Sequence, residues 1–183
     1  MKHFIVAGLS LIPIVFYIVA VSTDSWALSS GIATLFSNTP YQFNYGLFRS
    51  TTVIGSGASQ VTTKTNGCGS QTSTTVCDKG KTAEGFTVMA LIIVSGALVL
   101  SAMNKGVLAA PVFAISGIFG MIGWALWYGG VQQSSEVKDQ LTTFGSTDSG
   151  FSIGYSQALD IVAWTLSLLL APLAFFTSER YVK

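Results

Sequence analysis

The sequence predicts an α-helical membrane protein: a left-handed bundle of four transmembrane helices carrying a small extracellular antiparallel β-sheet. Of its 183 residues, 50% are hydrophobic and only 9% are charged, whereas a soluble domain carries about 25% charged residues. Four apolar runs are each long enough to cross a hydrocarbon core of about 30 Å at about 1.5 Å per residue. The two cysteines lie in a polar loop between the first two runs.

The first span is predicted at residues 4–22. Lys2 and His3 precede it, and Ala20-Val21-Ser22 would suit a signal-peptidase site, so a cleaved signal peptide is the alternative. We favour a retained helix, loosened at Pro13, because the apolar stretch exceeds the roughly 7–15 residues of a signal core. The remaining spans are predicted at 85–103, 107–131 and 158–177.

These spans define one domain over residues 1–183, with outer loops at 23–83 and 132–157. The ends opposite these loops are short, and each carries positive charge, at Lys2, Lys105, Arg180 and Lys183. Short basic flanks are typical of the cytoplasmic side. We therefore expect a multi-pass protein of the plasma membrane with both termini in the cytoplasm.

Small residues in the third span predict close helix packing. Gly117, Gly120 and Gly123 recur every third residue, and glycine lets helices approach in lipid, where apolar burial gives little drive for association. Packing within one chain is the favoured interpretation, and self-association between chains is the alternative.

Polar and aromatic residues at the outer ends of the spans predict interfacial roles. Asp160 lies near the start of the fourth span, where a capping or interfacial position would lower the cost of an acid in lipid. A polar contact with another helix or subunit is the alternative. Four aromatic residues are expected to be interfacial anchors, namely Trp26, Trp124, Trp127 and Tyr128.

The first outer loop has strand patterns. Tyr41, Phe43, Tyr45 and Leu47 alternate with small or polar residues, the period of a half-buried strand. Residues 26–28, 60–63 and 73–76 are further candidate strands. A Cys68–Cys77 bond would close a hairpin and add about 2–3 kcal/mol of stability; two free thiols are the alternative. No His or further Cys accompanies the pair, so we expect no metal and no cofactor.

The second outer loop should begin by extending the third helix through residues 136–139. Residues 145–154 are then expected to return as irregular or strand-like chain. Phe144, Phe151 and Tyr155 are either packed under the sheet or offered to a partner, and the sequence favours neither.

The loop motif Trp26, Gly46-Leu47, Cys68 and Cys77 resembles that of the claudin superfamily, which includes claudins, peripheral myelin and epithelial membrane proteins, and gamma-type channel subunits. Phe48 replaces the second tryptophan of that motif. The resemblance implies a sheet of about five strands, one from the second loop, with the Gly-Leu-Phe turn directed toward the bundle. In claudins the first cysteine follows the Gly-Leu turn closely, whereas residues 50–67 intervene here, either as a longer hairpin or as a flexible insertion. The end of the chain also departs from the claudin pattern, because Lys183 follows the Tyr-Val pair with which many claudins end.

The resemblance implies a non-enzymatic protein that forms cell–cell contacts, a junction or a paracellular barrier through its outer sheet. The alternative is an auxiliary subunit that packs its third and fourth spans on a channel or receptor. The expected partners are the bilayer and other membrane proteins, including copies of this chain. The net charge of +1 and the lack of catalytic motifs favour neither nucleic acid nor a small-molecule substrate.

Charged residues in and directly after the first outer loop are the candidates for ion preference or contact. They are Lys64, Asp78, Lys79, Lys81 and Glu84. The competing interpretation is that they are solvated loop charges.

Overall fold

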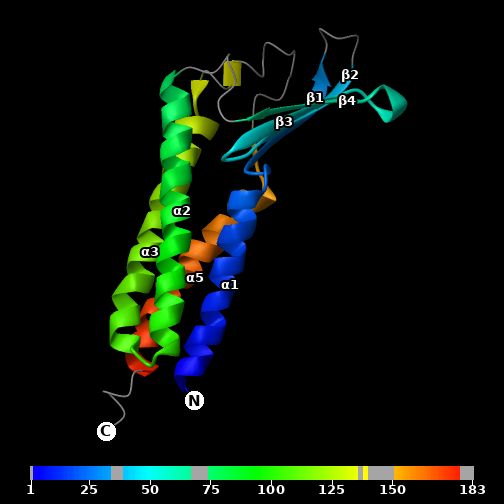
Figure 1. Cartoon of the computed structure of the whole chain (residues 1–183). Helices are drawn as coiled ribbons and strands as arrows, with labels where there is room; N and C mark the ends of the chain where they lie inside the picture. Colours follow the sequence, from blue (N-terminus) through cyan, green and yellow to red (C-terminus); the bar gives the residue numbers. More distant parts are fainter. Residues whose placement is uncertain (1, 34–38, 67–73, 136–137, 140–150, 178–183) are drawn as a thin grey trace. The chain divides into compact units, whose positions relative to one another are not determined.

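The chain is mostly helical. The computed structural model describes residues 2–33, 39–66, 74–135, 138–139 and 151–177. Its long helices are α1 (Lys2–Ser22), α2 (Thr74–Ala102), α3 (Gly106–Trp127) and α5 (Tyr155–Thr177) (Figure 1). Among the described residues, four helical segments are long and apolar enough to cross a membrane. The prediction of four long apolar helices is therefore confirmed.

Helix α2 begins earlier than the sequence indicated. Residues 74–76 belong to its first turn, so the strand predicted there is wrong; Ser73 lies outside the described residues. The β-branched residues favoured a strand locally, but the helix places Val76 and Gly80 four residues apart on one buried face. Packing of that face has overridden the local preference.

Helix α3 continues beyond Trp127 as a π-turn, η3 (Tyr128–Gln132). The apolar helical segment therefore runs over Gly106–Gln132. Farther on, the Lys138 N–H donates to the Ser134 carbonyl at 3.1 Å, and Lys138 and Asp139 are helical as expected. Residues 136 and 137 of that predicted extension lie outside the described residues.

The residues form two compact units. The bundle unit comprises residues 1–22, 85–124 and 159–183, and the sheet unit comprises residues 23–84 and 125–158. Helices α2, α3 and α5 contribute to both. Each unit is described below by itself.

Small side chains dominate the core of the bundle unit. In the main core cluster of its described residues, six of eleven members are alanine, at positions 90, 97, 109, 110, 163 and 174. Larger residues such as Tyr17 and Phe113 fill the space between them. This composition suits helices that associate by close backbone approach.

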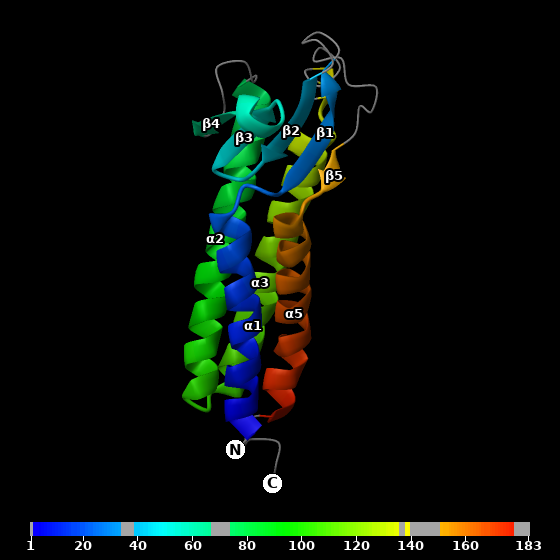
Figure 2. The ribbon, with the colours of Figure 1, turned by 90° about the vertical axis from the view of Figure 1, so that its right-hand side faces the viewer.

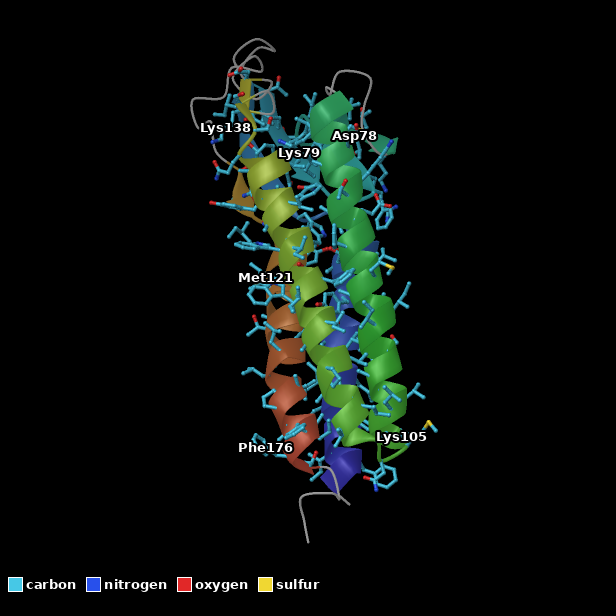
Figure 3. The ribbon with its side chains drawn as sticks, turned by 90° about the vertical axis from the view of Figure 1, so that its left-hand side faces the viewer. Asp78, Lys79, Lys105, Met121, Lys138 and Phe176 are labelled. Carbon is cyan, nitrogen blue, oxygen red and sulfur yellow. The ribbon has the colours of Figure 1, made fainter. Side chains whose placement is uncertain are left out.

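Large apolar side chains cover the outside of the bundle unit. Phe4, Ile92, Leu169 and Phe176 are each at least 60% exposed. Figure 3 shows Met121 and Phe176 projecting away from the helices. Soluble monomers rarely expose continuous apolar surface on this scale, so the distribution is typical of helices surrounded by lipid.

The ends of the bundle helices alternate in direction. The start of α1, the turn between α2 and α3, and the end of α5 lie at the same end of the unit (Figures 1 and 2). Asn104 closes the turn with a left-handed φ of 58°, and its N–H donates to the Ser101 carbonyl at 3.1 Å. Asparagine tolerates this conformation at a helix end.

The sheet unit contains a five-stranded antiparallel sheet in the order β4-β3-β2-β1-β5 (Figure 2). Its strands are β1 (Ala27–Ala33), β2 (Thr39–Tyr45), β3 (Arg49–Ile54), β4 (Val61–Asn66) and β5 (Ser152–Ile153). Strands were expected near 26–28, 41–47 and 60–63, and one strand was expected from the second loop. The observed sheet has all four.

The segment at 50–67 is an ordered hairpin over its described residues, which end at Asn66. Strand β3, which the sequence analysis missed, pairs with β4 from Arg49↔Asn66 to Ile54↔Val61. Between them, Gly55 has a φ of 101°, a conformation that side chains oppose and glycine adopts at little cost. The longer hairpin is therefore the correct alternative.

Replacing Gly117 by alanine should destabilise the bundle. A Cβ at this position would lie 2.6 Å from Leu168 Cγ and 3.0 Å from the Trp164 carbonyl oxygen, and overpacking costs about 1–3 kcal/mol. Gly96→Ala is the matched control, because its Cβ would have no described atom within 4 Å. Thermal unfolding of both variants in detergent checks this. Equal Tm changes in the two variants would contradict it.

Candidate functional site

An aromatic cluster forms the interior of the sheet unit. Trp26 and Trp127 are 0% and 1% exposed, and their rings meet edge to face with centroids 5.5 Å apart. Tyr45 lies 5.7 Å from Trp127 between ring centroids and 6.5 Å from Phe151. Phe43 also contacts Phe151, at 6.3 Å. Such ring pairs add about 0.5–1.5 kcal/mol beyond their burial, so this cluster holds the sheet unit together.

This burial corrects the prediction of interfacial anchors at Trp26 and Trp127. An anchoring ring must reach lipid headgroups, and both of these rings are buried. Trp124 is half-buried and lies 6.4 Å from Trp164 in the bundle unit. Of the second-loop aromatics, Phe151 is packed in the cluster, Tyr155 is 52% exposed, and Phe144 lies outside the described residues.

The Gly-Leu-Phe motif forms the tight connection between β2 and β3. The Gly46 N–H donates to the Arg49 carbonyl at 2.9 Å. A Cβ on Gly46 would overlap the Asp24 backbone and lie 2.9 Å from the Arg49 carbonyl oxygen. Leu47 is buried, whereas Phe48 is 40% exposed. The motif glycine is therefore required by the close approach of the chain at Asp24.

Sequence reasoning missed the residues that tie the second loop to β1. The Gly154 N–H donates to the Trp26 carbonyl at 2.9 Å, and a Cβ on Gly154 would overlap the Ser25 carbonyl. The Ser156 N–H donates to that same carbonyl at 3.1 Å. Asp24 also accepts a hydrogen bond of 2.5 Å from the Thr51 hydroxyl. No local pattern marks these residues, because their partners are distant in the chain.

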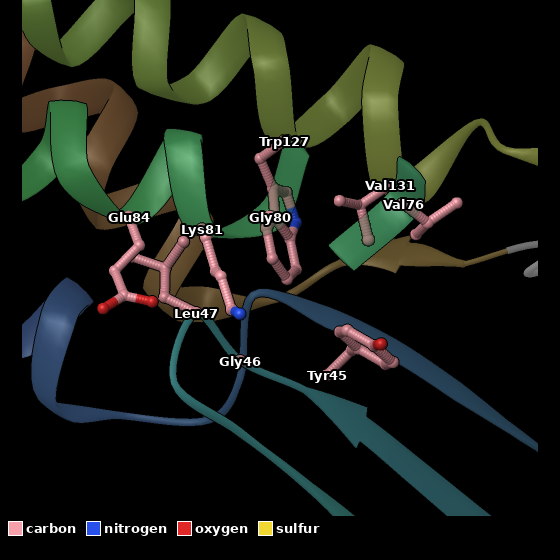
Figure 4. Close-up of a pocket in the computed structure, with 9 residues that line it drawn as sticks. All are labelled: Tyr45, Gly46, Leu47, Val76, Gly80, Lys81, Glu84, Trp127 and Val131. Atoms are coloured by element: carbon pink, nitrogen blue, oxygen red, sulfur yellow. The ribbon is translucent and has the colours of Figure 1, made fainter. Parts of the chain in front are cut away.

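A small cavity of about 60 Å³ lies beside the motif turn. Figure 4 shows Lys81 and Glu84 extending from α2 toward the turn that carries Gly46 and Leu47. The remaining lining residues are mostly apolar, namely Tyr45, Val76, Gly80, Trp127 and Val131. A cavity of this size holds a water molecule or two and is far below the roughly 300–1,000 Å³ of a ligand site.

The predicted charged residues occupy two different elements. Lys64 is exposed on β4, while Asp78, Lys79, Lys81 and Glu84 lie in the first three turns of α2. The sequence analysis had assigned Asp78, Lys79 and Lys81 to the outer loop; they are helical, and their position outside the membrane stays a prediction. Lys81 acts electrostatically on Glu84. The Lys79 stem packs over Gly130, where a Cβ would lie 2.8 Å from Lys79 Cδ.

The predicted disulfide cannot close a hairpin. Cys77 lies in the first turns of α2, so any bond to Cys68 would link the connection after β4 to a helix. Cys68 lies outside the described residues. The pairing itself stays a prediction.

Among the described strands, β4 is a free edge of the sheet, with β3 as its neighbour in the strand order. The side chains of residues 61–64 are all exposed, with Val61 at 62%. An edge strand offers backbone donors and acceptors to an added strand. The other edge, β5, is only two residues long.

The predicted packing residues lie inside the bundle unit. Gly117 faces Leu168 and Trp164, and Gly120 faces Tyr17 and Trp164; Gly123 is buried. Asp160 is fully buried in the sixth position of α5, outside the first turn. Its predicted capping role is therefore wrong, whereas an interfacial depth in a membrane stays a prediction.

Within the described ranges, no three His, Cys, Asp or Glu side chains lie together as metal ligands would. The expectation of no metal in the outer loops stays a prediction.

Gly46→Ala should destabilise the sheet unit. The new methyl group would collide with backbone at Asp24 and Arg49, and backbone yields less readily than a side chain, so a loss of at least about 2–3 kcal/mol is expected. Gly129→Ala is the control, because a Cβ there would meet no described atom within 4 Å. Limited proteolysis of the outer loops reports the difference. Equal protection in both variants would show that Gly46 does not carry this constraint.

Cys68 and Cys77 are expected to resist alkylation until the protein is reduced. A disulfide in an oxidising compartment protects both sulphurs, so the intact mass should gain two alkyl groups only after reduction. Cys77→Ser should expose one reactive thiol, at Cys68. Two alkylated thiols in the unreduced protein would exclude the bond.

No protein-family model and no curated protein matches this sequence. The resemblance to the claudin superfamily therefore stays a prediction that rests on the motif residues.

Proposed function

We propose that this chain is a non-enzymatic, claudin-type integral membrane protein that forms cell–cell contacts through its outer sheet. The observation that carries the proposal is the free edge of β4. Its side chains at residues 61–64 are exposed, and its outer backbone groups, which pair with no other described strand, can accept a strand from a neighbouring protein. The surface it offers is small, so contacts repeated along a membrane would supply the strength.

The four apolar helices support placement in a membrane. The segment from Val76 to Ala102 has 27 residues, or about 40 Å of helix, which exceeds a hydrocarbon core of about 30 Å. Because Asp78, Lys79, Lys81 and Glu84 lie in the first part of this segment, we place them outside the hydrocarbon. In that position they and Lys64 would form the polar outer surface that a contact or a paracellular path requires.

The short basic ends support the proposed orientation. Lys105 lies in the α2–α3 turn, at the same end of the bundle unit as the start of α1 and the end of α5 (Figure 3). The positive-inside rule would put this end in the cytoplasm. The plasma membrane, and cell junctions within it, are the proposed locations.

The auxiliary-subunit alternative has less support from the helix contacts. It required the glycine-bearing surface of α3 to pack on a channel or receptor. Gly117 and Gly120 instead face residues of α1 and α5 in the same chain, so a partner would have to use the lipid-facing surface.

Val61→Lys should weaken adhesion strongly if β4 is the contact edge. Cells expressing the full chain should aggregate, and the added charge should reduce aggregation at least about fivefold, because charges on an edge strand oppose strand addition. Ile153→Lys is the matched control, since Ile153 is 52% exposed on the opposite edge, β5. Surface labelling should show equal amounts of all three proteins.

Equal aggregation by wild type and Val61→Lys would contradict the β4 contact. Freeze-fracture images of the same cells should show intramembrane strands if contacts also form side by side. Purification in mild detergent with a channel at fixed stoichiometry, and without homo-oligomers, would favour the auxiliary-subunit alternative.

A further inference from the structure

Two aromatic side chains of the sheet unit are exposed, although other rings of that unit are buried. Phe48 is 40% exposed and Tyr155 is 52% exposed. Trp26 and Trp127 are 0% and 1% exposed. A single exposed apolar side chain is common on protein surfaces, so the places of Phe48 and Tyr155 in the fold decide what their exposure indicates.

Phe48 is held close to the C-terminal end of α1. Helix α1 ends at Ser22, and Asp24 follows two residues later. A Cβ on Gly46 would overlap the Asp24 backbone, and Phe48 is two residues beyond Gly46, a chain length of at most about 7 Å. Within this turn Leu47 is buried and Phe48 is exposed, so the Phe48 ring lies on the outside of the sheet unit.

Tyr155 is attached to the same short segment, residues 23–25. It is the first residue of α5, and the N–H of the next residue, Ser156, donates to the Ser25 carbonyl at 3.1 Å. The Ser156 and Thr23 hydroxyls are also hydrogen-bonded, at 2.5 Å. Residues 23–25 thus follow α1 directly in the chain and bond to the start of α5.

The lengths of these two helices place the segment at the boundary of the hydrocarbon. The α1 span, Phe4–Ser22, has 19 residues, or about 28 Å of helix, and α5 has 23 residues, or about 34 Å. A hydrocarbon core of about 30 Å would therefore end close to Ser22 and Tyr155. This step rests on the proposed placement of the four helices in a membrane.

We propose that Phe48 and Tyr155 anchor the sheet unit to the phospholipid headgroup layer of the outer leaflet. At that depth an exposed ring is surrounded by lipid unless another protein displaces it, and aromatic side chains favour this layer. Arg49, next to Phe48, is exposed as well, and a guanidinium group suits the phosphates found there. The bilayer itself is thus the partner that covers these rings.

Spin labels on single introduced cysteines test the depth of both rings. The full chain is placed in phosphatidylcholine nanodiscs, and nitroxide relaxation is measured with oxygen, which concentrates in lipid, and with a water-soluble nickel chelate. Labels at Phe48→Cys and Tyr155→Cys should respond more to oxygen and less to nickel than a label at Ile32→Cys, a 58% exposed position of β1. Unsubstituted protein treated alike measures any label on Cys68 or Cys77.

A label at Leu169→Cys separates this inference from the membrane placement on which it rests. Leu169 is 62% exposed on α5, so its label should respond most strongly to oxygen. If the Leu169 label lies in lipid while the Phe48 and Tyr155 labels respond to nickel as the Ile32 label does, the anchoring is overturned and the membrane placement stands. A Leu169 label in water would overturn both. A Phe48 label shielded from both reagents would show that protein covers the ring, which would also overturn the anchoring.

Limited proteolysis in nanodiscs gives a second readout that needs no label. Phe48→Ser is expected to raise the cleavage rate of the outer loops about 3- to 10-fold, because the ring no longer transfers apolar surface from water to the interface. Phe48→Trp should retain the wild-type rate, since tryptophan favours the same layer. Ile32→Ser is the matched control and should leave the rate unchanged. Equal cleavage of Phe48→Ser and wild type, or an equal increase in Phe48→Ser and Ile32→Ser, would contradict the anchor.

Discussion

The bundle depends on the close approach of α3 to α1 and α5. Between lipid-soluble helices the hydrophobic effect supplies little attraction, so association must come from dispersion contacts and polar groups. Gly117 and Gly120 bring Leu168, Trp164 and Tyr17 within contact of the α3 backbone. The alanines of the core act in the same way, and large apolar residues are left for the outer surface. The distribution is the reverse of a soluble bundle, whose large residues lie inside.

The sheet unit is packed with large side chains, in contrast to the small residues of the bundle core. Its interior is a cluster of large rings centred on Trp26, Trp127 and Tyr45, which bury much area per residue. Backbone hydrogen bonds made by Gly46 in the first loop and Gly154 in the second loop then hold the chain in position beside that cluster. A small sheet with one very short edge strand is stable only with such packing. The predicted disulfide would restrain the connection into α2, not the sheet strands themselves.

The sequence predicts the elements whose signals are local. Four apolar runs predicted the four long helices, and the alternation of apolar and polar residues predicted β2. Strand β3 has a weak pattern and was missed because its pairing with β4 is specified by the turn at Gly55. The burial of Trp26 and Trp127, the contacts of Gly154 and the position of Asp160 could not be predicted, because each depends on residues far away in the chain. An aromatic or acidic residue at a span end gives the same local signal whether it faces lipid or protein.

A free edge strand must also be protected against indiscriminate pairing. Lysine on an edge strand opposes addition of any strand that has no acidic or strongly polar residue to pair with the lysine charge. Lys64 lies exposed on β4, three residues from the apolar Val61. On the proposed function, the apolar residue would supply contact area and the lysine would restrict the partner to strands with an acidic or strongly polar residue opposite it. Selectivity would then arise from repulsion as much as from attraction. The same lysine would keep the protein from aggregating where no partner is present. Strand β4 would then determine both the adhesion and the solubility of the sheet unit.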